Sequence, residues 1–254
     1  MVVKVPPAGV IWHDLECGSY RADLPLWREL ADAATVGGRA ARVLDVGAGT
    51  GRVALDLASR GHRVTALDRD PELLAMLAER AGGLPVEAVL ADARDFSLTR
   101  DDYDLCVVPM QTVQLLHGAD ERGALFEHAR AHLRGGGTLA CAIVTVVDNF
   151  DSRAGGRGPT PERIKLGAHL YMSRAVLVAP GERSIRFERE RRVLPEGGAD
   201  EEPAPVEHDL IELEVLDEQQ LARELDSAGF EPLEPREIAE TDEHSGSTVV
   251  IARA

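Results

Sequence analysis

Residues 43–61 read VLDVGAGTGRVALDLASRG and constrain the fold more than any other stretch. A short apolar run ends in an acidic residue, three glycines follow at alternate positions, and a helical pattern comes next. Glycine accepts the positive φ angles of tight turns and lets a ligand lie close to the main chain. The stretch therefore predicts a buried strand, a tight turn that faces a ligand, and a helix.

Apolar and β-branched runs alternate with helical patterns along the first part of the chain. Asp70 and Pro71 begin one of these patterns as an N-cap and a first helical residue. The predicted strands cover 42–46, 62–67, 86–90, 104–108 and 138–146, and the predicted helices cover 50–60, 71–81 and 120–134. Strands and helices that alternate in this way indicate an α/β fold, with a mostly parallel sheet covered by helices on both faces.

The alternation stops after the fifth predicted strand. Residues 148–167 are rich in glycine, proline and charge, which favours a loop. Three extended stretches follow, at 168–178, 183–194 and 208–216, and they predict a small antiparallel sheet. The middle stretch alternates arginine with glutamate, so we expect its side chains to be exposed and paired across strands. A helix is expected at 217–229, with Asp217 as its cap and Gly229 at its end.

The length of 254 residues favours one domain, in which residues 148–216 form an inserted lid and residues 217–254 close the sheet. The net charge of −16 argues against a nucleic-acid partner, because phosphate binding needs a clustered basic surface. No apolar run is long enough to cross a membrane, so we expect a cytoplasmic protein. The three cysteines are widely spaced and predict no metal site. The oligomeric state stays open.

The glycine turn excludes two common phosphate sites. Its G-x-G-x-G spacing differs from the G-x-G-x-x-G of dinucleotide-binding turns, and no G-x-x-x-x-G-K-[ST] loop occurs. Asp45, two residues before the first glycine, suits a cationic or zwitterionic ligand. Asp68, at the end of the second strand, can accept hydrogen bonds from ribose hydroxyls. Asp92, after the third strand, can accept one from a purine amine. Together these acids indicate a nucleoside with a positively charged tail.

These features resemble the class I S-adenosylmethionine-dependent methyltransferases. The resemblance rests on D-x-G-x-G-x-G at 45–51, on Asp68, on Asp92 with Ala93, and on the ending of the fourth strand, VVPMQTVQLL. It covers residues from about 20 to 147 best. It implies a Rossmann-like sheet of seven strands in the order 3-2-1-4-5-7-6, with the last strand antiparallel, and S-adenosyl-L-methionine as the cofactor.

The resemblance also assigns roles to individual residues. It implies that Asp45 holds the cofactor's amino group through water and that Asp68, followed by Arg69, binds the ribose. Tyr20 resembles an N-terminal aromatic residue that closes over the cofactor. The remaining implied contacts are Gly47, Ala48 and Gly49 for the methionine part, Asp92 and Ala93 for the adenine, and Met110 and Gln111 beside the sulfonium.

Several of these residues also have simpler interpretations. The glycines could serve only a tight turn, and Asp95 could take the place of Asp92. His117 could remove a proton from the acceptor, since imidazole titrates near neutral pH, although a surface or helix-packing role is the alternative. His13, His169 and Tyr171 are lesser candidates, and no group of residues has the spacing of metal ligands.

The sequence thus predicts a methyltransferase that acts on an oxygen or nitrogen of a small molecule by in-line displacement. The alternatives are a protein that binds S-adenosylmethionine without transferring its methyl group, and a methyltransferase that acts on tRNA or protein. A nicotinamide-dependent dehydrogenase is a further alternative, which the missing third glycine of the dinucleotide spacing counts against. The acceptor itself is not indicated.

Overall fold

The computed structural model describes residues 5–154, 159–195, 205–241 and 245–254. The chain divides into two compact units. The larger unit contains residues 20–146 and 216–254, and the smaller one contains residues 1–19 and 147–215. That both units act as one domain, with the smaller one as a lid, stays a prediction.

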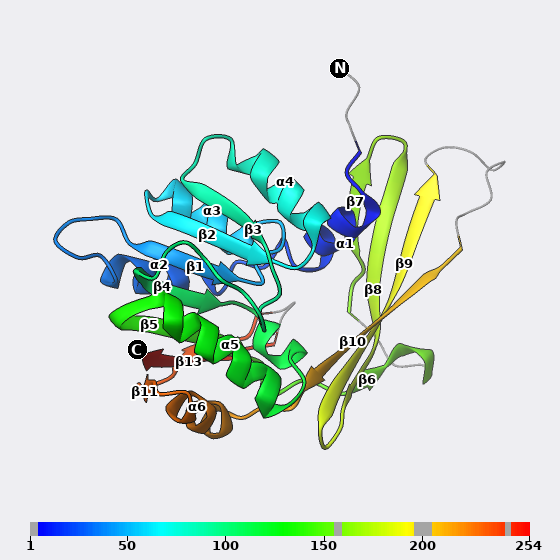
Figure 1. Cartoon of the computed structure of the whole chain (residues 1–254). Helices are drawn as coiled ribbons and strands as arrows, with labels where there is room; N and C mark the ends of the chain where they lie inside the picture. Colours follow the sequence, from blue (N-terminus) through cyan, green and yellow to red (C-terminus); the bar gives the residue numbers. More distant parts are fainter. Residues whose placement is uncertain (1–4, 155–158, 196–204, 242–244) are drawn as a thin grey trace. The chain divides into compact units, whose positions relative to one another are not determined.

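The larger unit is built around an eight-stranded sheet (Figure 1). Its strands are β1 (Arg42–Val46), β2 (Arg63–Asp68), β3 (Val86–Leu90), β4 (Tyr103–Val108), β5 (Leu133–Ile143), β11 (Glu231–Pro232), β12 (Arg236–Ile238) and β13 (Ser247–Arg253). They lie in the order β11-β13-β5-β4-β1-β2-β3, and β12 also pairs with β13. Strands β1 to β5 are parallel, whereas β13 is antiparallel to β5. The predicted order is therefore confirmed, with β11 and β13 as the sixth and seventh strands.

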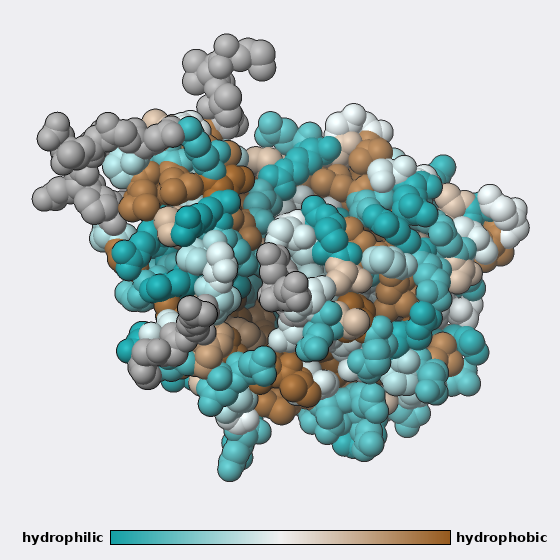
Figure 2. Space-filling view, turned by 180° about the vertical axis from the view of Figure 1, so that it is seen from behind, coloured by the Kyte–Doolittle hydropathy of each residue, from teal (hydrophilic) through white to brown (hydrophobic). Residues whose placement is uncertain are grey.

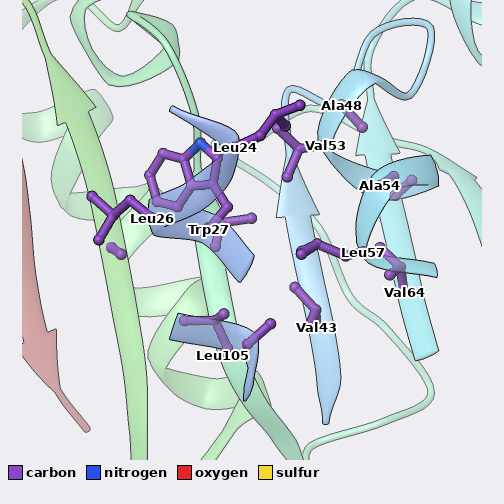
Figure 3. Close-up of a cluster of buried hydrophobic side chains, with 14 of the residues drawn as sticks. Leu24, Leu26, Trp27, Val43, Ala48, Val53, Ala54, Leu57, Val64 and Leu105 are labelled. Carbon is purple, nitrogen blue, oxygen red and sulfur yellow. The ribbon is translucent and has the colours of Figure 1, made fainter. Parts of the chain in front are cut away.

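Helices cover both faces of this sheet, as the sequence predicted. They are α2 (Leu24–Ala33), α3 (Arg52–Ser59), α4 (Pro71–Ala81), α5 (Gly118–His132) and α6 (Glu218–Ser227). Successive strand residues point to opposite faces, so Val43 joins the core under α2, α3 and α4 while Leu44 joins the core under α5 and α6. Figure 3 shows the first of these cores, where Trp27 of α2 and Leu57 of α3 lie on the same face of the sheet as Val43 of β1.

The predicted helix caps are present. Asp70 accepts hydrogen bonds from the amides of Glu72 and Leu73 at 2.8 and 3.1 Å, and Asp217 accepts one from Gln220 at 2.7 Å. Helix α5 ends earlier than predicted and β5 begins at Leu133, because the glycines at 135–137 favour extended chain and a bulge rather than another helical turn.

The smaller unit contains helix α1 (Ala8–Glu16) and a five-stranded antiparallel sheet. Its strands are β6 (Phe150–Asp151), β7 (Glu162–Leu166), β8 (His169–Pro180), β9 (Ser184–Pro195) and β10 (Glu207–Glu214). The three predicted extended stretches correspond to β8, β9 and β10. The loop prediction for 148–167 is wrong at β6 and β7, which both pair with β8. Strand β7 joins β8 through a two-residue turn where Gly167 has φ +60°.

The predicted exposure of the charged strand is also wrong in part. The side chain of Arg191 in β9 is only 14% exposed, because α1 of the same unit covers this part of the sheet. Its guanidinium makes two 2.8 Å hydrogen bonds to Glu16 of α1 and lies 5.8 Å from the ring centroid of Trp12. The helix itself was not predicted, so its charged contact with β9 was missed as well.

Hydrophilic residues predominate on the surface in Figure 2, and the hydrophobic patches between them are small. No helix within the described ranges is both long and apolar enough to cross a bilayer. A buried ion pair joins Arg122 of α5 to Glu224 of α6, at 2.7 and 2.8 Å. Arg122 has no exposed side-chain surface and also donates to the carbonyl of Leu116.

Replacement of Arg122 by alanine should lower the free energy of unfolding by about 3–5 kcal/mol, because it leaves the Glu224 carboxylate partly buried without its partner. Equilibrium unfolding in urea measures this change. The matched control is Arg100→Ala, which removes the exposed pair with Asp102 and should cost less than about 1 kcal/mol. Equal losses in the two variants would contradict the proposed contribution of the α5–α6 pair.

Candidate cofactor site

The turn between β1 and α3 is fixed by close packing at two of its glycines. Gly47 has φ +76°, and a Cβ there would lie 2.6 Å from the side chain of Thr112. Gly51 has φ +92°, and a Cβ there would lie 2.9 Å from Leu77. Glycine is thus required at both positions by neighbouring side chains rather than by open space for a ligand. That Gly47, Ala48 and Gly49 line a ligand stays a prediction.

Asp68 holds the turn from the neighbouring strand. One carboxylate oxygen accepts a 2.7 Å hydrogen bond from the amide of Gly49, and the other accepts a 2.9 Å bond from the amide of Asp70. Each oxygen of a carboxylate has two lone pairs, so both can accept a further hydrogen bond. Asp68 can therefore bind a pair of hydroxyls without releasing the turn. Arg69, which follows it, is exposed.

Asp45 lies beneath the turn and is completely buried. The amide of Ala54 in α3 favours its ionised form, but neither carboxylate oxygen meets a donor within hydrogen-bond geometry in the described ranges. Burial raises the pKa of this carboxyl from 3.8 to about 7, the charge of Arg52 opposes that rise, and the charge of Asp68 adds to it. An unpaired buried carboxylate fits a ligand that brings a positive charge to the turn.

Arg52 and Asp23 complete the base of the turn, and the sequence analysis missed both. The Arg52 guanidinium makes two hydrogen bonds to the Asp23 carboxylate, at 2.5 and 2.7 Å, and both side chains are more than nine-tenths buried. It also lies 5.2 Å from the ring centroid of Tyr20 and donates to the Tyr20 carbonyl at 3.2 Å. A basic residue is unfavourable at the start of a helix. Arg52, directly after the last glycine, therefore indicated in the sequence that an acidic residue pairs with it.

Asp92 follows β3 and is bound by Arg94, another residue that the sequence analysis missed. Arg94 donates to the two oxygens of Asp92 at 2.9 and 2.7 Å, and this ion pair lowers the pKa of Asp92 to about 2. Asp68 and Asp92 belong to neighbouring strand ends, because the amide of Ala91 donates to the Asp68 carbonyl at 3.0 Å. Asp92 is therefore ionised and near Asp68, while an adenine contact for it and Ala93 stays a prediction.

Met110 lies at the carboxyl end of β4 with φ +55°, and no other non-glycine residue in the described ranges has a positive φ. This left-handed conformation costs about 1–2 kcal/mol for a residue with a Cβ, and such strain gathers at functional sites. The following segment, Gln111 and the 3-10 helix η1 (Thr112–Leu115), is tied to the sheet. Buried Gln114 exchanges hydrogen bonds of 2.8 and 3.0 Å with the main chain of Val144, as a neighbouring strand would.

Of the predicted histidines, His117 belongs to the larger unit, and His13 and His169 belong to the smaller one. His117 is exposed and begins α5, where its amide donates to Glu121 at 3.0 Å. His13, His169 and Tyr171 belong to the smaller unit, and Tyr171 is buried with its ring centroid 5.5 Å from that of Trp12. A catalytic role for His117 stays a prediction. Across the described ranges no cluster of side chains has the composition of a metal site.

Comparison with known proteins finds a family model that matches the part of the chain containing this geometry. A family model described as "Methyltransferase domain" matches residues 43–137, which include the turn, Asp45, Asp68 and Asp92. Residues 43–137 thus match a methyltransferase domain, and the likeness to solved methyltransferase structures shows that the chain has their fold. S-adenosylmethionine is the cofactor of this family, and the unpaired Asp45 together with the open lone pairs of Asp68 fits its amino group and ribose.

The relatives differ in how much of the chain they cover. The cypemycin N-terminal methyltransferase of a Streptomyces species is 37% identical over 45% of each chain. Among solved structures, CalS10, an amino pentose methyltransferase from Micromonospora echinaspora, covers 96% of each chain with 21% identity and a TM-score of 0.70. The sugar N-methyltransferase KedS8 from a Streptoalloteichus species covers 99% of this chain and 95% of its own, with 17% identity and a TM-score of 0.70. The chain spans less than half the length of the curated relatives it matches.

Replacement of Asp45 by asparagine should stabilise the protein at pH 8. Because the folded-state pKa lies above the unfolded value, the wild-type protein loses stability as the pH rises from about 4 to about 7. A tenfold difference between the folded and unfolded acid constants corresponds to about 1.4 kcal/mol, so the variant should gain a few kcal/mol at pH 8 and almost nothing near pH 4. Urea unfolding at both pH values measures this difference.

The control for that experiment is Asp101→Asn, which changes an exposed carboxylate in the same unit and should leave the pH dependence of the wild-type protein intact. An Asp45→Asn variant whose stability follows pH with the same slope as the wild-type protein would contradict the raised pKa.

Proposed function

We propose that the protein transfers the methyl group of S-adenosylmethionine to an amine nitrogen of a small molecule. Support for a methyl transferase comes from the family of residues 43–137. Support for nitrogen comes from the names of the relatives. The cypemycin enzyme is an N-terminal methyltransferase, KedS8 is a sugar N-methyltransferase, and CalS10 is an amino pentose methyltransferase. The sequence alone left oxygen and nitrogen open.

The observation that carries the proposal is the set of carboxylates at neighbouring strand ends. Val46 pairs with Leu67, and Asp68 pairs with Leu90, so the carboxyl ends of β1, β2 and β3 lie at one edge of the sheet. In open α/β sheets this edge is where ligands bind. Asp45 can balance a positive charge, Asp68 can accept from hydroxyls, and Asp92 can accept from an amine, which together match a zwitterionic adenosyl ligand.

The bound cofactor supplies an electrophilic methyl group, and the chain's own residues provide the geometry. Asp68 is held by the amides of Gly49 and Asp70, so its oxygens keep a fixed direction for a ribose. The Gln114–Val144 bonds fix the segment after β4, where Met110 and Gln111 are expected to flank the sulfonium. Alignment of this kind can contribute about 7–11 kcal/mol to the lowering of a barrier.

The class of acceptor decides whether the transfer needs a base. A neutral amine carries its own lone pair and loses a proton to water after the transfer, so a dedicated base is not required. An alcohol would need a base within hydrogen-bond reach of its hydroxyl. His117 is the residue proposed for that part if the acceptor is an alcohol. A net charge of −16 counts against RNA as the acceptor.

The activity is tested by incubation of the protein with isotopically methyl-labelled S-adenosylmethionine and a mixture of small-molecule amines and alcohols, followed by mass spectrometry. Labelled amine products would support the proposal. Labelled alcohols would move the assignment to oxygen, and binding of the cofactor without any labelled product would favour a protein that binds the cofactor without catalysis.

Replacement of Asp68 by alanine should weaken binding of S-adenosylmethionine by about 1–3 kcal/mol, because two ribose hydroxyls lose their acceptor. Isothermal titration calorimetry measures the affinity, and circular dichroism checks the fold. Asp120→Ala, which removes an exposed carboxylate at the start of α5, is the control and should bind as the wild-type protein does. An unchanged affinity in Asp68→Ala would remove the ribose assignment.

A further inference from the structure

The cation whose charge acts on Asp45 is already bound in an ion pair with another residue. The charge of Arg52 in α3 acts on Asp45, but the Arg52 guanidinium gives two hydrogen bonds to Asp23, whose side chain is 1% exposed. The pair Arg52–Asp23 is close to neutral as a unit. Its two members act on Asp45 in opposite directions, since the charge of Arg52 lowers the pKa of Asp45 and the charge of Asp23 raises it.

Two neighbouring elements contribute groups to the surroundings of Asp45 that are not cations. Asp68 at the end of β2 is a like charge, and Cys106 of β4 is a buried thiol whose pKa is raised well above its usual value. Asp45 itself has neither exposed surface nor a partner within hydrogen-bond geometry among the described residues. A buried acid in these surroundings keeps its proton, because ionisation would place an uncompensated charge in a medium of low polarity.

The same residues also position the N-terminal segment. Arg52 donates to the carbonyl of Tyr20 and lies over its ring, while Asp23 accepts a 2.8 Å hydrogen bond from the indole of Trp27 in α2. The guanidinium is thus held by three independent contacts from the segment 20–23. It is not free to turn towards Asp45 while these contacts are intact.

We propose that Arg52 is a positioning residue. Because its charge is balanced by the ion pair with Asp23, Asp45 stays neutral until the positively charged part of the cofactor reaches the turn. The inference rests on the proposed binding of S-adenosylmethionine. When that ligand binds, its positive charge stabilises the Asp45 carboxylate, so Asp45 loses its proton to solvent. The resulting carboxylate then holds the ligand. Binding is thereby coupled to the release of one proton, and the Arg52–Asp23 pair sets the pH range of that coupling.

The sign of the pH dependence follows from the linkage. The ligand prefers the ionised form of Asp45, so its affinity should rise with pH by up to tenfold per pH unit and level off above about pH 7, where Asp45 is ionised without ligand. Loss of Asp23 would leave Arg52 as an uncompensated cation beside Asp45. The ionisation of Asp45 should then move to lower pH, and the dependence of the affinity should move with it.

The test compares three proteins: the wild type, Asp23→Asn, and the double variant Asp23→Asn with Arg52→Gln. The double variant keeps the local charge at zero while it removes the ion pair, so it is the matched control. Two measurements are made on each: the titration of the Asp45 carboxyl by carbon NMR without ligand, and the proton release on binding of S-adenosylmethionine by calorimetry in buffers of different ionisation enthalpy.

The wild type and the double variant should titrate near pH 7 and release a proton on binding at pH 6, whereas Asp23→Asn should titrate at least one pH unit lower and release much less. An Asp45 titration that is the same in Asp23→Asn and in the wild type would overturn the role of Arg52. A purely structural ion pair would instead change both variants alike, which would also overturn it. Titration as expected without any binding in the wild type would leave the charge arrangement in place and overturn the proposed cofactor and its coupling.

Discussion

The burial of a single carboxylate beneath the glycine turn shapes the rest of the site. Asp45 sits on β1 in the middle of the sheet, where both faces are covered by helices and water is excluded. An unpaired carboxyl there is destabilising once it ionises, and the core on either side of the sheet must offset that cost. The Asp45 carboxyl therefore weakens the fold at high pH, but it lies where it could pair with the positive charge of a ligand.

The turn above Asp45 is held from three sides. Thr112 fills the space beside Gly47, Leu77 fills the space beside Gly51, and Asp68 accepts from the amide of Gly49. These contacts come from η1, α4 and β2, so the turn cannot shift without disturbing all three elements. Met110, whose main chain is strained, lies two residues before Thr112 and so next to one of these contacts. A rigid turn of this kind is what the alignment of a methyl donor requires.

Much of the fold could be predicted because it depends on local pattern. The strands 42–46 and 86–90 and the helix 71–81 agree with the structure, since apolar periodicity, Asp70 and Pro71 are local signals. The strand order followed from the resemblance carried by the glycine turn and the acids at 45, 68 and 92. Helix α1 and strand β7 were missed because their burial depends on partners in the smaller unit rather than on their own periodicity.

The candidate site divides in the same way. The sequence by itself determined which strand ends carry Asp45, Asp68 and Asp92, because motif spacing along a parallel sheet fixes the edge at which residues lie. Only the tertiary structure decided what each carboxylate meets there: Arg94 at Asp92, two amides at Asp68, and, within the described part of the chain, no donor at Asp45. The reason is physical, since hydrogen-bond partners and desolvation come from side chains that are distant in sequence and meet only when the sheet and its helices have formed.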